Sequence, residues 1–456
     1  MARERTDPLI DLLLQGPTSA RQVREALNVS RPTVARHVRS ARDRVVRIGR
    51  ARATYYALRR EIRTLGDSWS AYRIDARGRP ALAASLHALV PRAWWYEPNG
   101  DAPAWLHGEF DHGLFPDLPW FLDDLRPQGF MGRAFARRYS DELGLSSDPR
   151  VWDAPGVLTA LLLHGEDSPG DFVIGDIALE RTQRAALSPP PSFGMADRSE
   201  QYSRLAQAAL AGDVAGSSAG GEQAKFMACL EDGGSHRHVL VKFSPPLDTL
   251  VGRRWADLLA CEHLASEVLR EHGIPACDTS LLMAHGRYFF QVTRFDRIGA
   301  HGRRGFATLF SLDNAYYGML DNWGASADRL QRDGWLSEGD ADLLRVLYWF
   351  GGLIGNADMH FANVSLALDD ARPLSLAPAY DMLPMHYRPA ATGEVLMTEF
   401  KAPLPMPQQV PTWLRATGIA LVFWERVQRD SRISDEFRAE ASRALVVTRL
   451  LRDRFG

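Results

Sequence analysis

Apolar positions in the first sixty residues follow helical spacing in three short stretches, DPLIDLLLQG (7–16), TSARQVREALN (18–28) and SRPTVARHVRSAR (30–42). Their ends carry helix signals, because Ser30 is a preferred N-cap, proline fits a first helical turn and Gly16 closes the first stretch. Residues 44–60 instead alternate apolar and polar side chains around an Arg/Gly-rich tip. The pattern predicts three helices followed by a two-stranded wing.

The region from about residue 66 to 185 mixes strand-like and helical patterns. SAYRID (70–75) and DFVIGDIAL (171–179) alternate as strands do, whereas FMGRAFARRYSDELG (130–144) has helical periodicity. Three consecutive prolines make LSPPPSFGMAD (187–197) the clearest linker, since proline neither continues a helix nor donates to a sheet. The aromatic residues Trp94, Trp95, Tyr96, Trp105, Trp120 and Phe121 are expected to pack as core or subdomain interface, with a peptide-docking groove as the alternative.

Beyond residue 200 a strand-rich lobe is expected to run to about residue 300 and a helix-rich lobe to the end. LLRVLYWFGGLIGN (343–356) and the last 35 or so residues show helical periodicity. The predicted fold class is α+β, with two kinase-like lobes and an N-terminal winged helix-turn-helix. The predicted domains are residues 1–64 (winged helix-turn-helix), 65–190 (α+β subdomain), 191–300 (small lobe) and 301–456 (large lobe).

Charge is unevenly distributed along the 456 residues. Residues 1–60 hold fourteen arginines against five acidic residues, a net charge of +9, whereas the whole chain carries −2. Only three of the 54 basic residues are lysines, Lys225, Lys242 and Lys401, so the positions that keep lysine merit attention. The basic module favours nucleic acid as its partner.

Three cysteines without C-x-x-C spacing predict neither a disulfide framework nor a zinc site, and the thiols are expected to be buried and reduced. No apolar run approaches the about 18 residues of a membrane span. The histidines show no ligand spacing, so metals other than Mg²⁺ are not expected. A cytoplasmic protein without a membrane partner is predicted.

The N-terminal pattern suits a helix-turn-helix whose second helix lies in the DNA major groove, with the wing on the backbone or a neighbouring groove. A small helical bundle with a solvated arginine face is the alternative. The candidate DNA contacts are Arg31, Thr33, Arg36, His37 and Arg39 on the helix and Arg47, Arg50 and Arg52 on the wing.

Five features of the C-terminal half occur in the order that phosphoryl transfer requires. Gly220 and Gly221 in GSSAGGEQAKF (216–226) can form a backbone anion nest, and Lys225 supplies a point charge. Lys242 lies in the alternating strand HVLVKF, and Glu262, in a helical stretch twenty residues later, can orient its amine for α- and β-phosphates. Taken singly, the glycine segment is more simply explained as a glycine-rich surface loop, and the alternative for Lys242 is a surface lysine on an edge strand.

The other features are acidic and amide side chains in the last third of the chain. In GLIGNADMHFANVSL, an apolar helix is expected to end at Gly355, followed by Asp358 as acceptor of a hydroxyl proton and Asn363 as a Mg²⁺ ligand. A short strand in LSLAPAYDML is expected to deliver Asp381 as a second oxygen ligand. A polar turn with capping side chains is the alternative, but ATP- and Mg²⁺-dependent phosphoryl transfer uses all five features.

Four segments, SAGGEQAK (218–225), TRFDR (293–297), NADMHFAN (356–363) and PAYDML (378–383), resemble the motifs of HipA-type serine/threonine kinases, the toxins of bacterial toxin–antitoxin modules. The resemblance covers roughly residues 80–440. The fused helix-turn-helix further resembles the YjjJ-type subgroup.

The resemblance implies a set of residue roles. Asp358 would be the catalytic base, Asn363 and Asp381 the Mg²⁺ ligands, and Lys242, with Glu262, the phosphate-pairing lysine. Ser218, or the adjacent Ser217, would be the site of inhibitory autophosphorylation. The nucleotide-binding set would comprise Ser218, Gly220, Gly221, Gln223, Lys225, Lys242, Thr293 and Phe295 at the adenine hinge, His360 and Tyr380.

The function predicted on this basis is a growth-inhibiting, DNA-binding protein kinase. The family suggests a translation component such as an aminoacyl-tRNA synthetase as protein substrate, and an antitoxin partner stays open. Two alternatives stay open as well: a transcriptional regulator whose kinase-like body only senses nucleotide or another ligand, and a kinase acting on a small metabolite or antibiotic.

Overall fold

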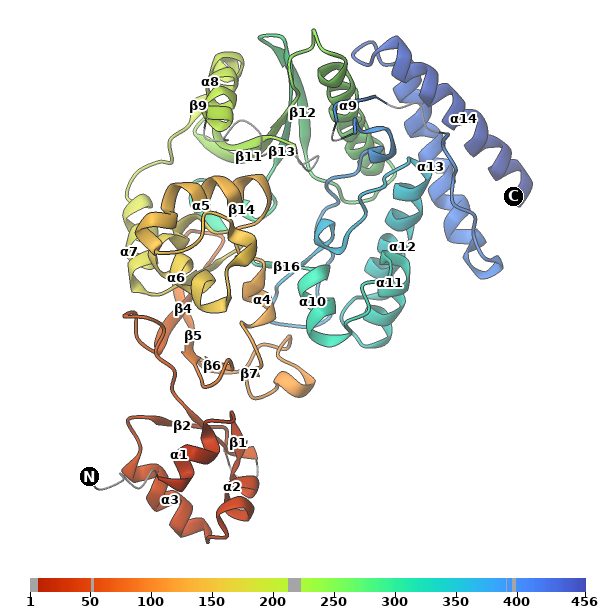
Figure 1. Cartoon of the computed structure of the whole chain (residues 1–456). Helices are drawn as coiled ribbons and strands as arrows, with labels where there is room; N and C mark the ends of the chain where they lie inside the picture. The colour runs from red at the N-terminus through yellow and green to blue at the C-terminus, as the bar shows by residue number, and fades with distance from the viewer. Residues whose placement is uncertain (1–6, 51–52, 212–222, 391, 396–398) are drawn as a thin grey trace. The chain divides into compact units, whose positions relative to one another are not determined.

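The computed structural model describes residues 7–50, 53–211, 223–390, 392–395 and 399–456. The chain, drawn in Figure 1, divides into two compact units. Unit 1 comprises Met1–Ile74, Pro80–Leu125 and Trp152–Arg184. Unit 2 comprises Asp75–Arg79, Arg126–Val151 and Ala185–Gly456.

Unit 1 contains a helical N-terminal part and a five-stranded antiparallel sheet of order β7-β6-β5-β4-β8. Its elements are α1 (Pro8–Leu13), β1 (Thr18–Ser19), α2 (Ala20–Leu27), α3 (Arg31–Ser40), β2 (Val45–Ile48), β3 (Tyr55–Leu58), β4 (Ser68–Ile74), β5 (Pro80–Ala88), β6 (Trp94–Pro98), η2 (Gly108–Phe110), β7 (Leu114–Phe115), α4 (Trp120–Asp123), α6 (Ala154–His164), η4 (Gly165–Asp167), β8 (Phe172–Ile174) and α7 (Asp176–Ala185).

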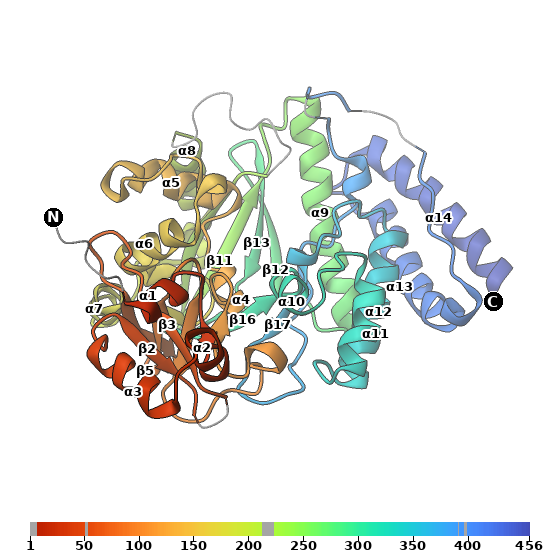
Figure 2. The same ribbon diagram turned by 60° about the horizontal axis from the view of Figure 1, so that its bottom comes forward.

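The three N-terminal helices begin at polar caps. The side chain of Asp7 accepts from the Leu9 amide at 3.0 Å, and that of Ser30 accepts from the Thr33 amide at 3.4 Å. The α2–α3 turn passes through Asn28 in the left-handed region (φ 50°), which asparagine tolerates. The predicted hairpin is present as β2 and β3, and a short strand β1 that the pattern did not indicate completes the sheet β1-β3-β2 (β1 and β2 are labelled in Figure 1, β3 in Figure 2).

The aromatic residues of unit 1 form its core, as expected. Trp94, Tyr96, Trp105 and Phe121 are almost completely buried, and the ring centroids of Trp105 and Phe121 lie 4.3 Å apart. The strand prediction for residues 171–179 was too long. β8 ends at Ile174, because Gly175 has φ +82° and turns the chain into α7.

Unit 2 contains a five-stranded sheet of order β12-β13-β11-β10-β9 and a helical part. Its elements are α5 (Gly129–Leu143), η3 (Pro149–Val151), β9 (Phe193–Gly194), η5 (Met195–Asp197), α8 (Arg198–Ala211), β10 (Lys225–Asp232), β11 (Ser235–Phe243), α9 (Leu250–Glu271), β12 (Thr279–Ala284), β13 (Arg287–Thr293), β14 (Arg297–Ile298), β15 (Gly302–Arg303), β16 (Phe306–Thr308), α10 (Leu309–Tyr316), α11 (Trp323–Arg332), α12 (Glu338–Leu353), η6 (Phe361–Asn363), β17 (Ser365–Ala367), η7 (Met385–Tyr387), η8 (Pro407–Gln409), α13 (Val410–Arg429) and α14 (Asp435–Phe455).

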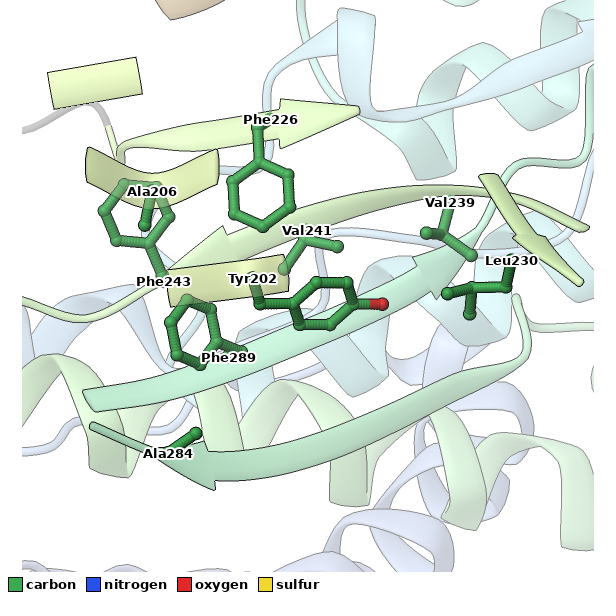
Figure 3. Close-up of a cluster of buried hydrophobic side chains, with 9 residues drawn as sticks. All are labelled: Tyr202, Ala206, Phe226, Leu230, Val239, Val241, Phe243, Ala284 and Phe289. Atoms are coloured by element: carbon green, nitrogen blue, oxygen red, sulfur yellow. The ribbon is translucent and has the colours of Figure 1, made fainter. Parts of the chain in front are cut away.

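Alternation along β11 places apolar side chains on one face of this sheet. Val239, Val241 and Phe243 pack with Tyr202 of α8 and Phe289 of β13 in a buried cluster (Figure 3). Because successive strand residues point to opposite faces, Lys242 projects from the other face, against which α9 lies. The sheet thus separates the apolar cluster under α8 from the face on which Lys242 meets Glu262 of α9.

The helical part of unit 2 packs around α13, which contacts α9, α12 and α14 (Figures 1 and 2). Its core includes Trp413 and Trp424, whose indole nitrogens donate to the carbonyls of Pro403 and Leu353 at 3.0 Å each. None of the described helices is long and apolar enough to cross a membrane. Cys229, Cys261 and Cys277 are free and buried, which confirms the prediction of buried thiols.

The segment 187–197 is only in part a linker. Its prolines lie in neither helix nor strand, but β9 pairs in parallel with β10 through Phe193 and Leu230. The sequence pattern did not indicate β9, because a strand of two residues is too short to be distinguished from a loop.

Candidate active site

Lys242 of β11 is the centre of a buried charged cluster. Its side chain is 6% exposed, and its Nζ donates to Oε1 and Oε2 of Glu262 at 2.7 and 2.9 Å. The same Nζ also contacts Oδ1 of Asp381. One ammonium group therefore holds two carboxylates from segments 20 and 139 residues away in the sequence.

The long helix α9 carries Glu262 to this position. Thr249 caps the helix by accepting from the Gly252 amide at 2.9 Å, and Glu262 lies on the buried face at 2% exposure. Burial raises the pKa of Glu262 to about 7, although the Lys242 ammonium acts in the opposite direction. The ion pair with Lys242 is what compensates for burying this carboxylate.

Positive charge dominates the surroundings of Asp381. Burial favours its neutral form, but the ammonium groups of Lys242 and Lys225 overcome that effect and lower its pKa. Lys225 begins β10 directly opposite Lys242 in the antiparallel register. Burial would lower the pKa of Lys242, but Asp381 and Glu262 outweigh it and raise that pKa above its ordinary value. The carboxylates of Glu262 and Asp381 therefore both lie near two lysines, Lys242 and Lys225.

The segment after α12 carries Asp358 and Asn363. The helix ends at Leu353 and the chain turns at Gly355 (φ +75°), so the helix stops two residues before the predicted end. The Asp358 amide donates to Oδ1 of Asn356 at 3.0 Å, and Nδ2 of Asn363 donates to the Asp358 carbonyl at 3.0 Å. These bonds fold residues 356–363 into a compact loop.

The segment before Asp381 forms single-residue β-bridges but no strand. The prediction of a short strand there was therefore wrong. Asp381 itself has φ +59°, in the left-handed region. Two side chains tie this segment to the 356–363 loop. Asn356 Nδ2 donates to the Asp381 carbonyl at 3.3 Å, and Tyr380 Oη donates to the Ala362 carbonyl at 2.9 Å.

The segment TRFDR lies at the end of β13. Asp296 is buried and accepts from Arg294 Nη2 at 2.7 Å and Arg297 Nη1 at 2.6 Å, which orders the turn. The ring of Phe295 stacks on that of Tyr380 at 5.7 Å between centroids. The aromatic pair therefore links the expected hinge to the segment of Asp381.

Profile and sequence comparisons show which known proteins this chain resembles. A profile described as "HipA-like C-terminal domain" matches residues 217–443, and one described as "YjjJ-like toxin, middle domain" matches residues 65–183. Toxin YjjJ of Escherichia coli (strain K12) is 36% identical over 431 residues, which cover 94% of both chains. The chain belongs to the YjjJ subgroup of HipA-type toxins. The predicted family is thereby confirmed.

Two solved structures are also similar to this YjjJ-type chain. HipA of Shewanella oneidensis MR-1, solved with HipB and its operator DNA, aligns with a TM-score of 0.51 and 14% identity over 85% of this chain and 99% of that one. The proinflammatory kinase CtkA of Helicobacter pylori aligns with a TM-score of 0.35 and 12% identity over 50% of this chain and 90% of that one. The likeness to HipA shows a shared α+β fold.

The structure brings most of the predicted site residues of this YjjJ-type protein into one region of unit 2. Lys242, Glu262 and Asp381 are in direct contact, and the side chains of Asn363 and Tyr380 hold the adjoining loop. His360 is exposed, and its charge acts on Asp381. Ser217, Ser218, Gly220 and Gly221 lie outside the described residues.

Thr293 occupies a different environment. It lines a cavity of about 460 Å³ whose other lining residues include His236, His238 and Arg297 but neither Lys242 nor Asp381. Its hydroxyl is buried without a hydrogen-bond partner among the described residues. The structure thus separates the Thr293 side chain from the charged cluster, whereas Phe295, two residues later, reaches Tyr380.

Asn356 is a site residue that the sequence reasoning missed. It is 7% exposed and connects the backbones of Asp358 and Asp381 through the two ends of one amide. A signal was present, because asparagine directly after a helix-ending glycine favours an Asx turn to the amide two residues on. That signal pointed to a turn but not to the contact with Asp381.

The residues present fit a magnesium-bound nucleotide. The Asp381 carboxylate and the Asn363 amide oxygen are the hard donors that Mg²⁺ prefers, and Lys225 and Lys242 suit phosphates. Nε2 of Gln223 is buried and has no partner in the described part of the chain, which leaves it as a donor. Within that part no group of three or more His, Cys, Asp or Glu side chains could hold a metal ion.

The candidate DNA contacts lie on α3 and the wing of unit 1. Arg31, Arg36, Arg39 and Arg50 are exposed, whereas Val34 of α3 is buried in the helical core. Thr33 bonds to Ser30 Oγ, and Nδ1 of His37 lies 3.6 Å from Oδ1 of Asp7. Arg52 lies outside the described residues. The described arginines leave a cationic helix face open to solvent.

Proposed function

We propose that this protein is an ATP- and Mg²⁺-dependent serine/threonine protein kinase of HipA type. The observation that carries the proposal is the Lys242 ammonium held between Glu262 of α9 and Asp381. A strand lysine oriented by a helix carboxylate is the arrangement by which kinases position α- and β-phosphates. In this arrangement binding and orientation, rather than covalent chemistry of the protein, lower the barrier.

Each side chain then has one task. Lys242 holds phosphate oxygens while Glu262 fixes its direction, and Asn363 and Asp381 hold Mg²⁺. Asp358 accepts the proton of the attacking hydroxyl, because it is the carboxylate of the same loop and only half-buried. When bound, Mg²⁺ neutralises charge on the β- and γ-phosphates.

The regulatory and partner assignments belong to the same proposal. Phosphorylation of Ser218, or of Ser217, silences the enzyme, and its protein substrate is a translation component such as an aminoacyl-tRNA synthetase. Residues 1–64 form a winged helix-turn-helix that binds DNA through the exposed arginines of α3. The proposal also includes an antitoxin partner and a cytoplasmic location. It keeps the predicted domain limits at residues 190 and 300.

Incubation with γ-labelled ATP and Mg²⁺ tests the enzymatic part. The wild-type chain and Asp369→Ala, which removes an exposed carboxylate from the same lobe, are expected to label themselves on a serine. Asp358→Ala is expected to lose that label by at least about a hundredfold. No label on protein in any variant identifies a regulator that only senses ligands, and label confined to small molecules identifies a metabolite kinase.

A further inference from the structure

We infer that Asn356 and Tyr380 form a reciprocal clamp that sets the spacing between the 356–363 loop and Asp381, and thereby the affinity for Mg²⁺. Each of the two segments sends one side chain to a backbone carbonyl of the other. The inference rests on the proposed function, because it treats Asn363 and Asp381 as the ligands that the clamp positions. Asn356 and Tyr380 are positioning residues in this scheme and act through Asn363 and Asp381. Tyr380, which the family resemblance assigns to nucleotide binding, is thereby reassigned, because its hydroxyl bonds to the Ala362 carbonyl.

Asn356 forms the first half of the clamp. Its Oδ1 accepts from the Asp358 amide at 3.0 Å, and its Nδ2 donates to the Asp381 carbonyl at 3.3 Å. The side chain is buried at 7% exposure, so water does not compete freely for either bond. The single planar amide of Asn356 therefore sets the distance between the backbone of Asp358, the candidate base, and the backbone of Asp381, a candidate metal ligand.

Tyr380 forms the second half, in the opposite direction. Its hydroxyl donates to the Ala362 carbonyl at 2.9 Å and lies 2.7 Å from Oγ of Ser365. Ala362 directly precedes Asn363, so this bond fixes the loop at its metal-ligand end. Stacking of the ring on Phe295 restrains the direction in which the hydroxyl points.

The backbone at Asp381 explains why such a clamp is needed. A left-handed φ of +59° is unfavourable for aspartate compared with glycine, and only isolated bridges support the preceding segment. Contacts from outside must therefore hold this conformation. The Asn356 bond reaches the carbonyl of Asp381 itself, and the Tyr380 bond originates one residue earlier.

The test compares two minimal changes with matched controls. Asn356→Asp keeps the acceptor for the Asp358 amide but removes the donor to Asp381, and Tyr380→Phe removes only the hydroxyl. The controls are Asn314→Asp, an exposed position on α10, and Tyr348→Phe on α12, whose hydroxyl has no hydrogen bond among the described residues. Binding of a fluorescent ATP analogue is titrated with Mg²⁺, and kcat and the KM for ATP are measured in parallel.

Each clamp variant is expected to raise the apparent Mg²⁺ dissociation constant about tenfold, as changes to groups that orient metal ligands do. The added charge of Asn356→Asp would by itself attract Mg²⁺, so weaker binding in this variant reports the lost bond. Nucleotide binding without Mg²⁺ and the KM for ATP at saturating Mg²⁺ are expected to stay close to wild type in both variants. The melting temperature is expected to stay close to wild type in Tyr380→Phe and to fall in Asn356→Asp, which places a carboxylate at a buried position. The double variant is expected to fall short of the product of the single effects, because both bonds hold the same two segments.

An unchanged Mg²⁺ midpoint in both clamp variants would overturn the inference while leaving a kinase intact. An equal loss of nucleotide binding with and without Mg²⁺ would also overturn it, since that pattern indicates general unfolding. A wild-type chain that binds nucleotide in a Mg²⁺-dependent way but transfers no phosphate would refute the proposed kinase and still allow the midpoints to support the clamp. Nucleotide binding that ignores Mg²⁺ in the wild type would refute both.

Discussion

The amine of Lys242 lies between the two carboxylate oxygens of Glu262, at 2.7 and 2.9 Å, with both side chains almost completely buried. Asp381 contacts the same amine from another segment, so this one ammonium group is in direct contact with two carboxylates. Removing the cation and removing one carboxylate should therefore have unequal consequences.

Lys242→Met is expected to destabilise the protein by about 3–5 kcal/mol, because the buried carboxylate of Glu262 and the half-buried carboxylate of Asp381 lose their partner. Glu262→Gln should cost less, about 1.5–3 kcal/mol, since Lys242 keeps Asp381. Without the cation the pKa of Glu262 rises further above its ordinary value, and the pKa of Asp381 loses the ammonium group that lowers it. Both changes favour the protonated carboxyls, so the penalty of Lys242→Met should be smallest near pH 5 and grow toward pH 8. Urea denaturation across this range measures it, and equal penalties for the two variants would contradict the proposed charge balance.

Asp257 of α9 provides a separate pH prediction. Its oxygens accept from the amide and hydroxyl of Ser434 at 2.7 Å each, yet burial raises its pKa to about 6 from an ordinary 3.8. The folded state then binds the proton more tightly than the unfolded state, so the free energy of unfolding should fall as pH rises from about 4 to about 6. The fall is at most about 3 kcal/mol.

Asp257→Asn should remove this part of the pH dependence, whereas Asp369→Asn at an exposed position should keep it. Denaturation midpoints measured between pH 4 and 7 provide the comparison. The same slope in Asp257→Asn and wild type would show that Asp257 is not the titrating group.

The proposed DNA contacts can be tested through salt. If α3 binds phosphates, the affinity for duplex DNA should fall steeply with ionic strength, and Arg36→Ala should reduce the slope of log K against log salt by about one. Arg454→Ala, an exposed arginine at the end of α14, should leave the slope unchanged. Fluorescence anisotropy at several salt concentrations measures the slope, and a flat response in the wild type would rule out an electrostatic interface.

Two helical glycines should respond in opposite directions to alanine. A β-carbon at Gly252 would collide with the carbonyl of Pro246 at the start of α9, so Gly252→Ala should cost about 1–3 kcal/mol. Gly418 of α13 has open space around the same position, and Gly418→Ala should stabilise the protein by about 0.5–1 kcal/mol. Thermal unfolding of both variants tests the pair, and a stable Gly252→Ala would show that the first turn of α9 can shift.

Local patterns in the sequence predicted those features that depend on neighbouring residues. The cap at Ser30, the alternation that points Lys242 away from the apolar cluster, and the helix before Gly355 follow from contacts within a few residues. Short pieces were missed or wrongly assigned for the same reason. β1 and β9 were missed, and the segment before Asp381 was predicted as a strand but forms only isolated bridges, because such brief segments show no clear period.

Tertiary structure alone decided which groups meet. The order of motifs indicated that Lys242, Glu262 and Asp381 share a site, but not that one amine contacts both carboxylates across 139 residues of chain. Nor did it indicate that the Asn356 amide reaches the Asp381 carbonyl. Periodicity determines the face to which a side chain points, whereas the partner on that face depends on how separate segments pack, and packing is a property of the whole fold.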